Sequence, residues 1–82
     1  MVETVKDQVI AAVQGTGDIV QATVDAVTRI LATTIKDTGK VGTSVTDVIA
    51  NVASGAVRGV VQVGGDLTQA AKGIMLGVLR GT

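Results

Sequence analysis

The 82-residue chain contains no cysteine, histidine, proline, phenylalanine, tyrosine or tryptophan. Without cysteine there can be no disulfide, thiolate chemistry or zinc–thiolate site, and the redox compartment cannot be read from the sequence. Without histidine and cysteine, the chain lacks the side chains that most often act as acid, base or nucleophile. Ser44 and Ser54 have no candidate base, so we predict that the protein is not an enzyme. The missing aromatic residues also remove the side chains that bury the largest areas.

Charge is sparse and balanced. Seven basic and seven acidic residues give a net charge of zero and are spread along the chain. Nucleic-acid binding needs a dense basic face, so nucleic acid is not an expected partner. The N-terminal residues lack the basic start and apolar core of a signal peptide. No uncharged run approaches the roughly 20 residues of a membrane span, and the apolar stretch 73–79 is bracketed by Lys72 and Arg80. We therefore expect a cytoplasmic protein.

The spacing of apolar residues indicates helices, although valine and threonine intrinsically favour strands. Strict alternation is nearly absent from the chain. Instead, apolar residues recur every 11 positions, as in the series Val2, Val13, Val24 and Ile35 and the series Val41, Val52, Val63 and Ile74. Eleven residues in three turns is about 3.67 residues per turn, which is a helical period. The sequence therefore predicts an all-α chain.

The apolar stripe slips by one residue between Ile35 and Val41. One continuous helix would misalign its own apolar face at this point. The segment between the two halves is rich in turn residues, and Gly39 can supply the left-handed residue that ends a helix. Ser44, followed by Asp47, resembles a capping box that opens the next helix.

These signals predict one domain, residues 1–82, that forms a long antiparallel helical hairpin with an 11/22-residue hydrophobic repeat. The arms are expected at about 2–37 and 44–80, with a turn near 38–43 that contains Gly39 and Gly42. Each arm would be about 50 Å long at 1.5 Å per residue. The hairpin would pack into a helical bundle or a filament.

Two glycine-rich stretches leave an alternative open. VQGTGDIVQA begins at Val13 and VQVGGDLTQA at Val61, 48 residues later. Asp18 and Asp66, each followed three residues later by glutamine, resemble N-caps where a helix would restart. The apolar columns nevertheless pass through both stretches without slipping. We therefore expect a continuous or mildly kinked helix at each stretch, with a true turn as the alternative.

Small residues recur at helical spacing in the second half of the chain. GAVRG at Gly55 returns as GVLRG at Gly77, 22 residues later. Glycines four residues apart let helix axes approach closely and gain dispersion contacts. The predicted helix-packing and assembly residues are Gly55, Gly59, Gly73, Gly77, Gly81, Val24, Leu31, Ile35, Val45, Val52, Leu67 and Ile74.

No cofactor, metal or small-molecule substrate is expected. The glycine-rich stretches follow no strand and lack the Lys-Ser/Thr of a P-loop, which argues against a phosphate site. Asp18, Asp25, Asp47 and Asp66 follow the polar repeat rather than the spacing of a calcium loop. We interpret them as part of a solvated face.

The segment VDAVTRILATTIKDTGKVGTSVTDVIANVASGAVRG resembles the 11-residue repeat regions of perilipins and alpha-synuclein. It is also similar to group 3 late-embryogenesis-abundant proteins, which are more charged. The resemblance rests on period and composition, and it implies an amphipathic helix that coats a lipid surface or folds on drying. This chain has fewer lysines and a phase slip that suits a hairpin.

A lone hairpin leaves one side of each apolar stripe without a partner, and ordering about 80 residues needs more burial than it supplies. We therefore expect a structural protein that assembles with itself into an oligomer or filament. The alternative is an amphipathic helical protein that coats a lipid droplet or membrane surface.

Overall fold

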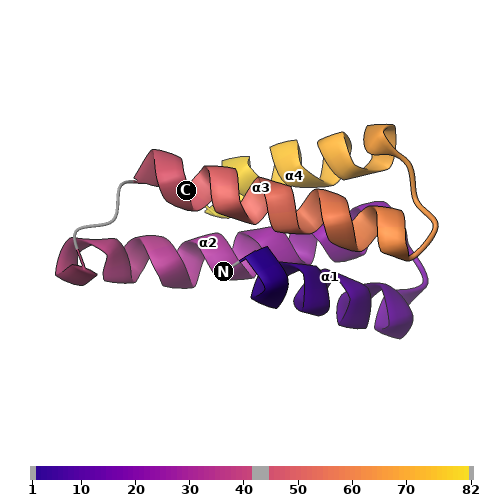
Figure 1. The fold of residues 1–82 in the computed structure, drawn as a ribbon, viewed down its shortest axis with the longest axis horizontal. Helices are drawn as coiled ribbons and strands as arrows, with labels where there is room; N and C mark the ends of the chain where they lie inside the picture. The colour runs from indigo at the N-terminus through magenta and orange to yellow at the C-terminus, as the bar shows by residue number, and fades with distance from the viewer. Residues whose placement is uncertain (1, 42–44, 82) are drawn as a thin grey trace.

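Four α-helices make up the described part of the chain. The computed structural model describes residues 2–41 and 45–81, with side chains given for 2–34 and 46–81. The helices are α1 (Val2–Thr16), α2 (Ile19–Val41), α3 (Val45–Gln62) and α4 (Leu67–Gly81), and these described residues include no strand (Figure 1). The prediction of an all-α chain is confirmed.

Each predicted long arm is itself a hairpin of two shorter helices. The first arm breaks between Thr16 and Ile19, and the second breaks between Gln62 and Leu67. The fold spans 36 × 21 × 20 Å, shorter than the arm of about 50 Å that a continuous helix would form. The prediction of two continuous or mildly kinked arms at about 2–37 and 44–80 is therefore wrong.

The first break is a true reversal, built from a left-handed glycine and an N-cap. Gly17 has a φ of 74°, and its N–H donates to the carbonyl of Val13 at 2.7 Å. A single bond of this kind is the αL way of ending a helix. Asp18 then caps α2, because its side chain accepts the N–H of Gln21 at 3.0 Å and its carbonyl accepts the N–H of Ala22.

The second break ends α3 with the two bonds of a Schellman motif. Gly64 has a φ of 91°, and its N–H donates to the carbonyl of Val61. The N–H of Gly65 donates to the carbonyl of Val60 at 2.8 Å. Only glycine adopts such a φ readily, so the motif depends on Gly64.

A complete capping box then starts α4. The Asp66 side chain accepts the N–H of Gln69 at 2.8 Å, and the Gln69 side chain accepts the N–H of Asp66 at 3.0 Å. Two backbone N–H groups that the helix leaves unpaired are satisfied in this way. The local cap signals that compete with the apolar period in the sequence therefore mark the true helix boundaries.

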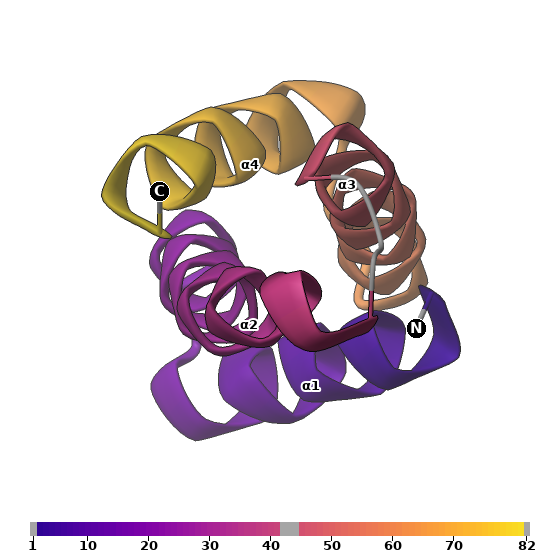
Figure 2. The ribbon, with the colours of Figure 1, turned by 90° about the vertical axis from the view of Figure 1, so that its left-hand side faces the viewer.

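The two hairpins stack with like helices side by side. Seen from its end, the bundle follows the order α1, α2, α4, α3 (Figure 2). α1 and α3 both run toward the end that carries the two glycine turns, and α2 and α4 both run away from it (Figure 1). The main contacts between the hairpins join α1 to α3 and α2 to α4. The fold is thus a stack of two hairpin repeats, which we call the first hairpin (α1–α2) and the second hairpin (α3–α4).

A small core of valine, alanine and leucine lies between the hairpins. Its fully buried side chains include Leu31, Val5, Val9, Val27, Val48, Val52 and Val60. The buried polar side chain is Thr23, whose hydroxyl donates to the carbonyl of Ile19 at 2.7 Å. The hydroxyl is therefore satisfied within its own helix.

The turn between the arms was predicted near residues 38–43, but the first four of these residues are still helical in the structure. Gly39 lies within α2, which continues to Val41. Gly42, the other predicted turn residue, lies outside the described residues. α3 begins at Val45, close to the predicted start of the second arm.

Candidate interaction surface

The glycines of α3 face the valines of α1 at very close range. A Cβ atom on Gly55 would lie 2.6 Å from the Cβ of Val5, and one on Gly59 would lie 2.9 Å from the Cβ of Val9. Real Cβ atoms do not approach neighbours this closely, so both positions need bare backbone. The close approach lets α1 and α3 gain dispersion contacts along their whole shared length.

The glycines of α4 make the same contact with α2. A Cβ atom on Gly73 would lie 2.5 Å from Thr23, and one on Gly77 would lie 2.6 Å from Val27. At the end of the helix, a Cβ atom on Gly81 would lie 2.9 Å from the Cβ of Leu31. The predicted glycine strip therefore packs against another helix of the same chain.

All five glycine contacts share one register. The partner lies 50 positions earlier each time: 55 against 5, 59 against 9, 73 against 23, 77 against 27, and 81 against 31. The sequence repeat that relates the hairpins is 48 residues long. The two numbers differ by two. In the second hairpin, the positions equivalent to those that receive glycines in the first hairpin therefore lie two residues before its own glycines.

The other predicted packing residues divide between the core and the surface. Val24, Leu31 and Val52 are buried, and Ile74 is partly buried against the core. Leu67 is 68 % exposed and contributes nothing to the core. Ile35 and Val45 belong to α2 and α3, but their side chains lie outside the description.

The second hairpin carries apolar side chains on the side that faces away from the first, half-buried at Ala53 and Val57, which also packs against the core, and exposed elsewhere. A residue two positions before an inward-facing glycine points about 200° away from it, since each helical residue turns about 100°. We call this surface the outer face, which comprises Ala53, Val57 and Val61 of α3 and Leu67, Ala71, Met75 and Leu79 of α4. Val61 is 53 %, Met75 65 % and Leu79 73 % exposed.

A groove along α4 belongs to this surface. It is lined by Ile74, Met75, Val78 and Leu79, all of which are apolar. On the opposite flank of α4, a second groove is lined by Met75, Leu76 and Leu79 with Val20 of α2 and Lys72. Met75 and Leu79 line both grooves and are the centre of the exposed apolar area.

Met75 and Leu79 were not among the interaction residues predicted from the sequence, although the sequence contains a signal for them. Residues 73–79 form an apolar run between Lys72 and Arg80, and seven successive residues of a helix point in all directions around its axis. Such a run predicts that apolar side chains extend beyond the side of the helix that packs against the core. In the structure, Ala70, Gly73 and Gly77 are buried and Ile74 and Val78 pack partly against the core, whereas Met75, Leu76 and Leu79 are exposed.

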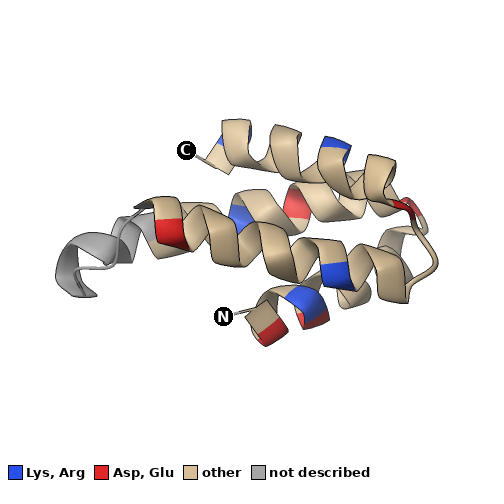
Figure 3. Ribbon diagram, turned by 45° about the horizontal axis from the view of Figure 1, so that its top comes forward, with Lys and Arg blue, Asp and Glu red and all other residues tan. Residues whose placement is uncertain are grey.

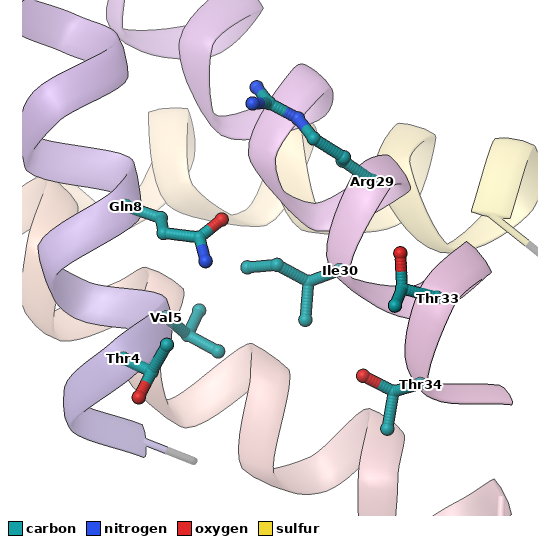
Figure 4. Close-up of a pocket in the computed structure, with 7 residues that line it drawn as sticks. All are labelled: Thr4, Val5, Gln8, Arg29, Ile30, Thr33 and Thr34. Atoms are coloured by element: carbon teal, nitrogen blue, oxygen red, sulfur yellow. The ribbon is translucent and has the colours of Figure 1, made fainter. Parts of the chain in front are cut away.

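The first hairpin is polar on the surface that faces away from the second. A hollow of about 350 Å³ lies between α1 and α2, lined by Thr4, Val5, Gln8, Arg29, Ile30, Thr33 and Thr34. Figure 4 shows the Gln8 amide reaching toward Ile30, with the hydroxyls of Thr33 and Thr34 on the α2 side. The hollow is open, and most of its polar side chains are exposed. Its residues include no histidine, cysteine or carboxylate that would serve as a general base or nucleophile.

Charged residues lie on both hairpins (Figure 3). α1 carries an exposed ion pair in which the Lys6 ammonium lies 2.9 Å from the Glu3 carboxylate. The hydrogen bond from Lys6 lowers the pKa of Glu3, and the same bond raises the pKa of Lys6. By contrast, α4 contains no acidic residue, and its only charged side chains are those of Lys72 and Arg80.

Comparison with protein-family models, curated protein sequences and solved structures finds no match for this chain. Across residues 2–41 and 45–81, no cluster of carboxylates is arranged to hold a metal ion. None of the helices in these ranges combines the length and apolar character needed to cross a bilayer. The exposed apolar outer face is therefore the feature of the described structure with the clearest potential for binding.

Proposed function

We propose that this chain is a non-enzymatic structural protein that assembles with further copies of itself through apolar helix surfaces. The observation that carries the proposal is that α4 leaves large apolar side chains exposed, with Met75 and Leu79 among the most exposed of the described residues. Contiguous exposed apolar surface on a small domain usually marks an interaction site. Because the glycine strip already packs against α1 and α2 of the same chain, we propose the outer face as the assembly surface.

The stacked repeat supports self-assembly in a second way. Hairpin repeats gain stability from their neighbours, and a terminal repeat normally ends the stack with a polar outer side. The first hairpin has such a polar side, whereas the second ends in the apolar outer face. Covering that face would remove Met75 and Leu79 from water at about 25 cal/mol per Å² of apolar area.

Sedimentation velocity with light scattering, over a protein concentration series without lipid, tests the proposal. We expect a defined oligomer or filament that dissociates on dilution. A monomer at every concentration would contradict self-assembly. Far-UV circular dichroism on the same samples establishes that the chain is helical in each state.

A lipid surface is the second candidate partner, because Lys72 and Arg80 stand beside the apolar side chains of α4 without any acidic residue on that helix. Basic residues next to an apolar helix face suit anionic lipid headgroups. Flotation with anionic and with neutral liposomes separates the two proposals. A protein that stays monomeric and floats only with anionic liposomes would support lipid binding instead.

A further inference from the structure

We infer that the outer face binds the outer face of a second copy, so that two chains form a closed two-fold dimer rather than an open head-to-tail stack. The inference rests on the proposed self-assembly and names its mode.

The outer face is the repeat equivalent of the surface that the first hairpin turns toward the second. Subtracting the repeat of 48 from the outer-face positions leads to Val5, Val9, Val13, Ile19, Thr23, Val27 and Leu31. Each of these is buried or half-buried beneath the second hairpin. The outer face therefore has the position and composition of a packing surface, and its cover is missing from the single chain.

A head-to-tail neighbour would cover the outer face poorly. In a head-to-tail stack, the first hairpin of the next copy would pack on the outer face as the second hairpin packs on the first within one chain. The residues of that first hairpin that are equivalent to the packing glycines would then touch the outer face. These residues are Asp7, Ala11, Asp25, Arg29 and Thr33, all of them exposed. If the next copy kept the spacing of the glycine contacts within the chain, its Asp25 would lie against Ala71 and its Arg29 against Met75. Burying these charges against apolar side chains would be strongly unfavourable.

A second outer face has none of these conflicts, since all seven of its residues are apolar. A two-fold contact needs only one self-complementary patch, because residue i of one copy meets residue j of the other and the reverse. Lys72 follows Ala71 in α4 and lines the groove that α4 forms with Val20 of α2. It stands at the edge of the patch, where its ammonium can stay in water. The polar outer side of each first hairpin then closes the assembly at both ends.

The first test compares charge substitutions on the two ends of the stack. Met75→Lys with Leu79→Lys should weaken association at least about a hundredfold, since two exposed apolar side chains at the centre of the contact become charged. The matched control, Ala11→Lys with Thr33→Lys, alters the other end and should leave the dimer unchanged. All four positions are exposed, so the helical fold should survive, which circular dichroism checks.

The outcomes separate the inference from the proposed function. A wild-type dimer that only the outer-face variant dissociates supports both. Species that grow beyond the dimer and are blocked by the control variant would overturn the closed dimer and retain self-assembly. A wild-type protein that stays monomeric would overturn both.

The second test uses the absence of cysteine from the chain. Met75→Cys introduces a single thiol at the centre of the exposed apolar area, where the two-fold axis of a closed dimer passes and the two copies of one residue lie close together. Mild oxidation should then produce a covalent dimer, because a disulfide forms only when the two Cα atoms are about 4.4–6.8 Å apart. Thr33→Cys is the matched control and should remain monomeric on a denaturing gel. Equal cross-linking of the two variants would overturn the inference.

Discussion

Gly77 of α4 and Val27 of α2 lie so close together that a Cβ atom added to the glycine would stand 2.6 Å from the Cβ of the valine. Both residues are buried, and they are 50 positions apart in the chain. The contact shows why glycine is used in the middle of a helix, where it costs about 1 kcal/mol relative to alanine. The bare backbone sets how closely the two hairpins stack.

Gly77→Ala should destabilise the fold by about 1–3 kcal/mol, because the added methyl group overpacks the α2–α4 contact. The expected loss outweighs the gain in helix propensity. The control is Gly15→Ala in α1, where an added Cβ would meet no atom within 4 Å. That variant should be stabilised by about 0.5–1 kcal/mol. Urea unfolding followed by circular dichroism measures both. Equal effects in the two variants would contradict the packing role of Gly77.

Gly64 should tolerate asparagine better than valine. Its φ of 91° lies in the left-handed region, and an added Cβ atom would meet nothing within 4 Å, so the expected loss comes mainly from the backbone conformation. A β-branched residue in this region should lose at least about 1–2 kcal/mol, whereas asparagine visits it more readily. Thermal unfolding of Gly64→Asn and Gly64→Val measures the difference. If valine were no worse than asparagine, the Schellman ending of α3 would be in doubt.

Asp66→Ala should lower the free energy of unfolding by about 1 kcal/mol, because it removes the cap at the start of α4. Gln69→Ala should have a smaller effect, since it removes only the return bond to the Asp66 N–H. Asp7→Ala, on the exposed side of α1, is the control for loss of a carboxylate. Chemical unfolding at neutral pH compares the three. A loss for Asp7→Ala as large as that for Asp66→Ala would show that charge, not capping, is responsible.

Lys6→Ala should raise the pKa of Glu3 toward its ordinary value of 4.5, because the hydrogen bond and the charge of Lys6 hold it below that value. A carboxyl group whose pKa is lowered by folding contributes stability above about pH 4.5 that is lost as the pH falls through the lowered pKa. Lys6 has the opposite sign: its raised pKa contributes stability below pH 10.5 that is lost as the pH rises further.

The Glu3–Lys6 pair is exposed, so its effect on unfolding should be small and reduced by salt. NMR titration of the Glu3 carboxyl carbon is the direct measurement, with Lys72→Ala as the control. An unchanged Glu3 pKa in Lys6→Ala would exclude the pair in solution. The chain has no histidine or cysteine, so we expect the thermal midpoint to stay nearly constant from about pH 6 to 9.

The glycine turns show where sequence reasoning fails. The apolar columns run through residues 13–24 and 63–74 without a change of phase, which favours continuous helices. The 11-residue spacing shows only which side of each helix is buried. The apolar sides of α1 and α2 are buried in the same core. A chain reversal at Gly17 can therefore leave the period intact. The capping signals of Asp18 and Asp66 were the better guide because they concern the helix ends directly.

The sequence by itself determined that the chain is helical, which side of each helix is apolar, and that the glycines at 55, 59, 73, 77 and 81 need a close neighbour. Only the tertiary structure decided that this neighbour belongs to the same chain and that the outer face remains uncovered. The physical reason is that the hydrophobic effect is non-directional, so an apolar stripe gains the same free energy from any apolar surface that covers it. The chain reversals at Gly17 and Gly64 decide which helix packs against each glycine, because they stack the two hairpins in one register.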